Sequence, residues 1–458
     1  MRTLIQNGLI VTAADTYKAD ILIEGDTIVA IGQGLQAETV INAEGKYVFP
    51  GFIDPHVHMA LPVGDLVSSD DFATGTIAAA CGGTTTIIDF VTPERGQSLV
   101  EAVELRRAEA DGRVAVDYSL HLTAVDASPR TLAEIAELAA EGYTSLKLYT
   151  TYPALMVDDG QMLRLLATAR QHNILPIVHT ENHHIIEYLK AELLAAGKRA
   201  PRYHPLSRPP RAEAEAANRV LALAATVGCP LYIVHLTCRE TLEVVERARA
   251  AGQEVYAEVC TQHLLLSQDD YERPGFEGAK YVLSPPLRDR ANWEPLWRAL
   301  AEGRLQTVAT DHCPWNFVGQ KDQGRDDFTQ IPNGAPGVET RVPLLYSEGV
   351  GRGRLPLNRF VEACATAPAR LFGLYPRKGT IAVGSDADLV IYDPEREMRL
   401  SPANLHMNVD YSPYEAFTVQ GYPAMTLLRG QVIARDNEFV GRVGGGEFLK
   451  RNPFSPLP

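Results

Sequence analysis

Residues 52–58 read Phe-Ile-Asp-Pro-His-Val-His, a short apolar run that ends in two histidines. Residues two apart on a strand point to the same face, so the imidazoles of His56 and His58 can reach one ion. In an α/β barrel, residues at the ends of the strands form the catalytic rim. Three further apolar runs end in a residue of metal-binding type, and together these positions predict a metal site on one rim: His179, His235 and Asp311.

The middle of the chain, residues 51–377, alternates between short apolar runs and helix-type segments rich in Ala, Leu, Glu and Arg. Eight strands that alternate with helices predict a (β/α)8 barrel. A doubly wound sheet ranks below it, because no Gly-x-Gly-x-x-Gly follows the first strand. The runs expected to form the strands are 52–57, 84–90, 114–122, 144–149, 174–179, 231–235, 254–260 and 307–310.

Both ends of the chain differ from the middle and consist of short β-type runs separated by glycines. Residues 19–24, Ala-Asp-Ile-Leu-Ile-Glu, have the pattern of a half-buried strand. We therefore expect residues 1–50 and 378–440 to form one small β-sandwich-like domain beside a catalytic barrel of residues 51–377. Residues 441–458 are expected to form a tail that lies at a subunit interface or frays.

Composition narrows the class of protein. The 458 residues include 57 acidic and 43 Lys or Arg side chains, which gives a net charge of −14. This charge argues against nucleic acid or an anionic membrane as a partner, because both attract clustered Lys and Arg. The six cysteines contain no Cys-x-x-Cys pair, which favours reduced, mostly buried thiols. No signal peptide or apolar run of about 18 residues is evident, so we expect a cytoplasmic, soluble protein.

The proposed ligands are imidazoles and a carboxylate without a thiolate, which favours zinc, with manganese, cobalt or nickel as substitutes. Lys147 lies in the middle of the apolar run 144–149, where an unpaired ammonium would be costly. One interpretation is a lysine paired with a carboxylate. The other is a neutral lysine that has added carbon dioxide, so that its carbamate bridges two metal ions. The spacing of residues leaves both open.

Five longer motifs connect these residues to a known family. They are Gly-Phe-Ile-Asp-Pro-His-Val-His (51–58), His-Pro-Leu-Ser-Arg-Pro-Pro (204–210), Ser-Pro-Pro-Leu-Arg (284–288), Ala-Thr-Asp-His-Cys-Pro (309–314) and Pro-Asn-Gly-Ala-Pro-Gly-Val-Glu-Thr-Arg (332–341). With these motifs the chain resembles the dihydropyrimidinase and hydantoinase family of the amidohydrolase superfamily, and within it the bacterial D-hydantoinases. The resemblance covers almost the whole chain.

The resemblance implies a centre of two divalent metal ions, Zn²⁺ before others. One ion would be held by His56, His58 and Asp311, and the second by His179 and His235. Lys147, as N6-carboxylysine formed from carbon dioxide, would bridge the two ions. The implied ligand set is therefore His56, His58, Lys147, His179, His235 and Asp311.

The implied reaction is hydrolysis of the cyclic amide of 5-monosubstituted hydantoins and dihydropyrimidines to N-carbamoyl amino acids, with D-selectivity. A metal-bridging hydroxide would attack the carbonyl, and Asp311 would move the proton to the leaving nitrogen. Tyr152 would bind the substrate and its oxyanion. Ser284 and Asn333 would bind the ring amide through main-chain groups. Without the resemblance, Tyr152 has the pattern of a core residue and the other two of turn residues.

Other histidines and two loops complete the candidate site. His183, His184 and His312 lie near the expected rim and are candidates to support the metal ligands, whereas without the resemblance each has the pattern of a structural histidine. The loops 59–72 and 150–158 are apolar, and we expect them to line the pocket for the ring substituent, with Leu66 among the lining residues. The alternative is that these loops pack on each other or on another subunit.

Several alternatives remain at this point. The chain resembles dihydropyrimidinase proper closely enough that the two activities overlap, and allantoinase and dihydroorotase are more distant siblings. A different class is a non-enzymatic scaffold of the collapsin response mediator type, but those proteins have lost metal ligands that this chain keeps. The resemblance also implies a homotetramer that acts on a small cyclic ureide.

Overall fold

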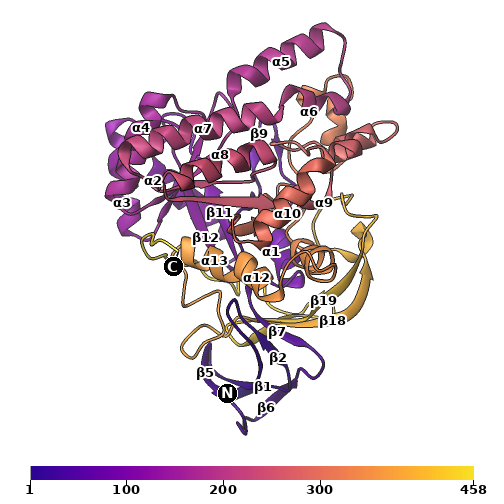
Figure 1. Cartoon of the computed structure of the whole chain (residues 1–458). Helices are drawn as coiled ribbons and strands as arrows, with labels where there is room; N and C mark the ends of the chain where they lie inside the picture. The colour runs from indigo at the N-terminus through magenta and orange to yellow at the C-terminus, as the bar shows by residue number, and fades with distance from the viewer. Residues whose placement is uncertain (1, 458) are drawn as a thin grey trace.

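The computed structural model describes residues 2–457, and its centre is an eight-stranded parallel sheet (Figure 1). The strand order β17-β16-β15-β14-β13-β12-β11-β8 follows the chain around an almost closed barrel. All eight expected runs form strands, which confirms the (β/α)8 prediction. The strands are β8 (Phe52–Asp54), β11 (Thr84–Val91), β12 (Asp117–Thr123), β13 (Ser145–Tyr149), β14 (Leu175–His179), β15 (Leu231–Ile233), β16 (Val255–Cys260) and β17 (Thr307–Ala309).

Side chains join the first and last strands of the barrel, β8 and β17. The buried guanidinium of Arg341 donates hydrogen bonds of 2.8 Å to the carbonyls of Ile53 and Val308, one on each strand. Asp54, which ends β8, accepts from the backbone N–H of Thr310 at 3.2 Å and from its hydroxyl at 2.7 Å. These bonds fix the end of β17 beside the end of β8, where the histidine pair begins.

Helices surround the barrel, and a capping side chain precedes several of them. Ser98, Ser128 and Asp158 each accept a backbone hydrogen bond from the first turn of the following helix. The helices are α1 (Phe72–Cys81), α2 (Leu99–Ala110), α3 (Pro129–Ala140), α4 (Asp159–Gln171), α5 (His183–Ala195), α6 (His204–Ser207), α7 (Pro210–Val227), α8 (Arg239–Ala250), α9 (Thr261–Leu265), α10 (Trp293–Ala301), α11 (Arg341–Leu345), α12 (Leu357–Val361) and α13 (Ala367–Leu371). Figure 1 shows α5 standing out from the rest of the barrel.

Shorter helical turns lie in the loops, and π-helical turns continue two of the helices. The π-helical turns are η7 (Tyr346–Val350) after α11 and η8 (Glu362–Thr366) after α12. The 3₁₀ turns are η1 (Pro201–Tyr203), η2 (Gln268–Glu272), η3 (Glu277–Tyr281), η4 (Arg290–Asn292), η5 (Lys321–Gly324), η6 (Phe328–Gln330) and η9 (Pro402–Asn404).

Strands from both chain ends build a separate β region below the barrel (Figure 1). β7 (Tyr47–Pro50) pairs antiparallel with β18 (Leu389–Arg399), so the two ends share one seven-stranded sheet of order β21-β20-β19-β18-β7-β2-β3. A four-stranded sheet, β5-β4-β1-β6, completes the region. The domain boundaries at 50/51 and 377/378 stay a prediction. The remaining strands are β1 (Arg2–Gln6), β2 (Leu9–Val11), β3 (Thr16–Lys18), β4 (Asp20–Glu24), β5 (Thr27–Gly32), β6 (Thr39–Asn42), β19 (Thr418–Leu428), β20 (Gln431–Arg435) and β21 (Glu438–Phe439).

The C-terminal tail runs across the N-terminal ends of this chain's own barrel strands. The backbone of Tyr118 in β12 bonds to Glu447 and Leu449 at 2.9 and 2.7 Å, and Leu449 is fully buried. The N–H of Leu457 donates to the hydroxyl of Tyr256 at 3.1 Å. The tail therefore packs on the barrel end opposite the histidines, and a role for it at a subunit interface stays a prediction. No helix within residues 2–457 is long and apolar enough to cross a membrane.

Candidate active site

A cavity of about 380 Å³ opens at the C-terminal ends of the barrel strands. The strand ends and the loops after them bring every implied site residue to this one cavity, although these residues are spread over most of the chain. The implied residues that line it are His56, His58, Lys147, Tyr152, His179, His235, Ser284, Asp311 and Asn333.

Two histidines of the site meet at one carboxylate oxygen of Asp311. The Nε2 atoms of His56 and His58 each lie 3.1 Å from Oδ1 of Asp311. Ligand atoms of the three residues lie within 4.8 Å of one another, as in a metal site. Burial raises the pKa of Asp311, but the two imidazoles outweigh it and hold that pKa well below its usual range. The donor set thus suits a divalent cation, with two nitrogens and one ionised carboxylate.

Two buried carboxylates behind the histidines were missed by the sequence analysis. Glu258 Oε1 accepts from Nδ1 of His56 at 2.8 Å, and Glu181 Oε2 accepts from Nε2 of His179 at 2.8 Å. Each carboxylate fixes one ring nitrogen as a donor, so the other nitrogen is free to bind a metal. A sequence signal existed for Glu258, because it is a carboxylate within the apolar run 254–260.

The second pair of histidines lies next to the first. The ring centres of His179 and His235 are 4.5 Å apart, and His235 is 5.5 Å from His56. Glu258 Oε1 also accepts from the backbone N–H of His235 at 3.1 Å, so one carboxylate supports both halves of the site. Lys147 is buried beside them, with Nζ 5.0 Å from the ring centre of Phe90, and burial lowers its pKa to about 8.

Three of the site residues have strained backbones. Tyr152, His235 and Asp311 adopt φ values of 66°, 38° and 54°, the left-handed region that favours glycine. Each such residue costs about 1–3 kcal/mol and persists only where the surroundings enforce it. Strain gathered around one cavity is typical of a functional site.

The proposed ring-binding residues lie on two adjoining loops. The hydroxyl of Ser284 donates to Oδ1 of Asn333 at 3.0 Å, and Nε1 of Trp315 donates to the Asn333 carbonyl at 3.0 Å. Gly334 has φ of 140°, and a Cβ there would lie 2.3 Å from the carbonyl oxygen of Cys313. The absence of a side chain at Gly334 therefore allows its backbone to approach that of Cys313.

Tyr152 lies beside Ser284 at the same cavity and next to a buried ion pair. Its ring centre is 5.3 Å from that of His179 and 5.5 Å from the guanidinium carbon of Arg208. Arg208 in turn pairs with Glu181 at 2.5 Å. The motif 204–210 carried this arginine, but the sequence analysis gave it no role.

The remaining sequence-based candidates are only partly at the site. His312 is fixed behind Asp311, where Nε2 lies 3.1 Å from Asp70 and Nδ1 accepts from the backbone N–H of Gly337 at 3.1 Å. His183 and His184 begin α5 and do not line the cavity. The two histidines contact each other instead, with ring centres 5.3 Å apart.

Residues of the apolar loops 59–72 and 150–158 line the cavity, as expected, but Leu66 is not among them. Leu61, Val63 and Leu155 line it, whereas Leu66 does not. The segment expected as a loop contains a small hairpin, in which β10 (Leu66–Val67) pairs with β9 (Pro62–Val63). Val63 of β9 lines the cavity, and its partner Leu66 lies outside that lining.

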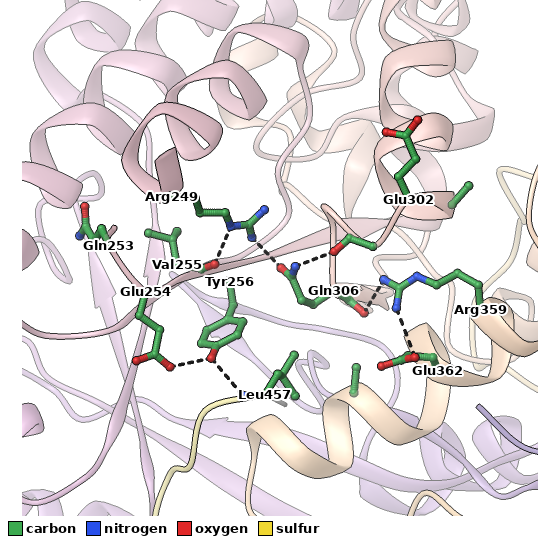
Figure 2. Close-up of a pocket in the computed structure, with 13 residues that line it drawn as sticks. Arg249, Gln253, Glu254, Val255, Tyr256, Glu302, Gln306, Arg359, Glu362 and Leu457 are labelled. Carbon is green, nitrogen blue, oxygen red and sulfur yellow. Dashed lines mark hydrogen bonds and ion pairs between the residues drawn. The ribbon is translucent and has the colours of Figure 1, made fainter. Parts of the chain in front are cut away.

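A larger cavity, of about 550 Å³, lies at the other end of the barrel (Figure 2). Its two arginines already have partners: Arg249 donates to Gln306 Oε1 at 2.7 Å, and Arg359 donates to the Leu300 carbonyl at 2.9 Å and pairs with Glu362 at 3.9 Å. Active sites of α/β barrels lie at the C-terminal ends of the strands, so the smaller cavity is the candidate site.

The sequence pattern of the amidohydrolase family matches residues 47–433. The chain belongs to the amidohydrolase family. It is 49% identical over 456 residues to the D-hydantoinase of Ralstonia pickettii, a match that covers 99% of this chain and 100% of the relative. A solved dihydropyrimidinase from Brevibacillus agri NCHU1002 is 47% identical, with a TM-score of 0.99 and full coverage of both chains. A solved L-hydantoinase (dihydropyrimidinase) from Arthrobacter aurescens is 32% identical, with a TM-score of 0.89 and coverage of 98% of this chain and 99% of that one.

Membership of the amidohydrolase family implies a metal centre, and the group of His56, His58 and Asp311 meets the requirement for one. The residues around that group fit it as well, because two more imidazoles and a buried lysine face the same cavity. This amidohydrolase therefore combines a metal-binding rim, an apolar wall and a pair of polar loops in one pocket.

Proposed function

We propose that this chain hydrolyses the ring amide of 5-monosubstituted hydantoins, and of dihydropyrimidines, to N-carbamoyl amino acids, with preference for D-enantiomers. The observation that carries the proposal is the convergence of His56 and His58 on Asp311 inside a cavity that also contains His179, His235 and Lys147. The cavity of about 380 Å³ suits a small cyclic ureide with a side chain. The D-hydantoinase name of the relative from R. pickettii supports the substrate class and the handedness.

The residues present suit a two-metal centre. His56, His58 and Asp311 would hold one ion, His179 and His235 the other, and Lys147, carboxylated by carbon dioxide, would join them. Zinc is the first candidate for this donor set. When bound, such ions polarise a carbonyl oxygen and acidify water, so that a nucleophile is available near neutral pH.

The chain's own groups account for the rest of the reaction. Main-chain groups of Ser284 and Asn333 hold the ring amide, and the hydroxyl of Tyr152 donates to the carbonyl oxygen as that oxygen gains charge. Asp311 accepts the proton of the attacking water and returns it to the ring nitrogen as the ring C–N bond breaks. The products are one carboxylate and one carbamoyl group on the same molecule, so no leaving group departs.

Dihydropyrimidinase proper is the second candidate, and the near-complete superposition with the B. agri dihydropyrimidinase favours it over allantoinase. The scaffold alternative is disfavoured because all six implied metal-ligand residues are present at one cavity.

The test is the ring-opening rate of the purified chain on D- and L-5-substituted hydantoins, dihydrouracil, allantoin and dihydroorotate. We expect turnover of D-hydantoins and dihydrouracil. Activity confined to dihydrouracil would change the preferred substrate and leave the mechanism intact. No ring opening by a metal-loaded sample would refute the proposal and favour the scaffold.

We also infer a cytoplasmic homotetramer. The six cysteines are buried and unpaired, which suits a reducing compartment. Light scattering coupled to size exclusion gives the subunit number, and a mass of one chain would contradict the tetramer.

A further inference from the structure

Lys321 is a fully buried lysine outside the metal site. It begins η5, in the segment between β17 and α11, and its side chain is 0% exposed. Lysines are almost never buried in this way unless they are paired. The partners of Lys321 are two main-chain carbonyls: Nζ donates to Val282 at 2.9 Å and to Pro332 at 3.0 Å.

The two carbonyls belong to the two ring-binding loops. Val282 lies two residues before Ser284, and Pro332 lies directly before Asn333. The loops also contact each other, because the N–H of Gly334 donates to the Val282 carbonyl at 3.1 Å. Lys321 thus ties together the segments that carry the two main-chain contacts of the ring amide.

The fit of η5 against these loops is close. A Cβ at Gly324, the last residue of η5, would lie 2.7 Å from the backbone nitrogen of Ile331, next to Pro332. Lys321 does not line the cavity, so its amine lies behind the loops and not in the pocket.

The charge state of the amine suits this role. Burial lowers the pKa of Lys321 to about 7. A neutral amine has two N–H donors, which matches the two carbonyl acceptors. A buried donor of this kind is expensive to leave unmatched, which favours a fixed geometry.

We propose that Lys321 is a positioning residue for substrate binding, whose amine sets the spacing between the loops of Ser284 and Asn333 that grip the ring amide. The inference rests on the proposed function, because the ring amide is the group that these loops would bind. The cyclic amide is common to all the proposed substrates, whereas the apolar wall would contact only the substituent.

The test uses the full-length, metal-loaded enzyme with Lys321→Met, which keeps an apolar chain of similar length and removes the donors. We expect KM to rise about tenfold, the size of one well-placed hydrogen bond, with kcat changed by less than about threefold. The rise is expected to be equal for substrates with small and bulky substituents, so their ranking does not change. Metal content is expected to equal that of the wild type.

The matched control is Lys378→Met. Lys378 is almost as buried as Lys321, but it bonds to Asp117 and Asp388 at 2.6 and 2.7 Å, at the junction of barrel and β region. Its loss is expected to lower Tm and leave KM unchanged. If Lys321→Met does not fold, Lys321→Gln retains two N–H donors on a shorter chain and is expected to show a smaller rise in KM.

The outcomes separate the two proposals. A folded Lys321 variant with the wild-type KM, or with kcat lowered at constant KM, would overturn the positioning role while the proposed function stands. A wild-type enzyme that opens none of the rings would refute the proposed function and this inference with it.

Discussion

At the scale of single residues, the site depends on carboxylates that touch no substrate. Glu258 holds Nδ1 of His56 at 2.8 Å, the backbone of His235 at 3.1 Å and the hydroxyl of Tyr232 at 2.9 Å. The substitution Glu258→Gln removes the charge and keeps the shape. Because such partners orient metal-binding histidines, we expect metal affinity to fall by about 10–100-fold.

Metal content after dialysis against graded chelator concentrations checks this prediction. A suitable control is Glu187→Gln, since Glu187 contacts Lys190 on the outside of α5. Wild-type metal retention in the Glu258 variant would show that the carboxylate serves packing alone.

Lys321 also gives a pH dependence of stability. Its folded pKa of about 7 lies below the ordinary lysine value of 10.5, so the unfolded chain binds the extra proton between these two values. The contribution of Lys321 to the free energy of unfolding therefore rises with pH between these two pKa values, by up to about 1.4 kcal/mol per pH unit. Below pH 7 both states are protonated, and the full cost of burying the ammonium remains.

Urea unfolding of the wild type and Lys321→Met at pH 7, 8 and 9 measures this dependence. We expect the free energy of unfolding of the wild type to increase relative to that of the variant as the pH rises. A difference between the two that is independent of pH would contradict a neutral amine in the folded state.

At the scale of elements, the apolar wall sets which substituent fits. Leu155 follows β13 on the loop after Tyr152 and faces the cavity, as does Leu61 on the loop after the histidine pair. Shortening Leu155 to Ala removes part of the wall and enlarges the cavity. We therefore expect kcat/KM for 5-benzylhydantoin to rise relative to that for 5-methylhydantoin. Leu66→Ala, outside the lining, is the matched control and is expected to leave this ratio unchanged.

Relative kcat/KM values in mixtures of the two substrates measure the effect. If the ratio of kcat/KM for the two substrates is the same in the wild type and Leu155→Ala, the ring substituent does not contact Leu155.

The elements also show what the sequence could predict. The barrel strands were detectable as short apolar runs that alternate with helix-type segments, and some of these runs stop at a polar residue, as Leu175–His179 does. The β9–β10 hairpin was missed, because two-residue strands carry no periodic signal. Glu181 and Arg208 were missed as well: their pairing joins residues 27 positions apart, and only the folded barrel brings them together.

At the scale of the whole molecule, the two ends of the barrel differ in role: one carries the candidate active site and the other packs against the C-terminal tail. The C-terminal ends of the strands carry the ligand-type residues, with strained backbones at Tyr152, His235 and Asp311, whereas the N-terminal ends are covered by the tail. The β region, built from both chain ends, is joined to the barrel through the buried charges of Lys378, Asp117 and Asp388. Stability and chemistry are thus placed on different parts of the fold.

The central claim is that a metal centre on this rim opens cyclic ureides of one handedness. The most direct measurement is the ring-opening rate on D- and L-5-phenylhydantoin before chelation, after chelation, and after Zn²⁺ is restored. We predict opening of the D-enantiomer that is lost with the metal and regained with Zn²⁺, while the L-enantiomer reacts far more slowly. Ring opening that persists in a chelated sample shown to be free of metal would contradict the account.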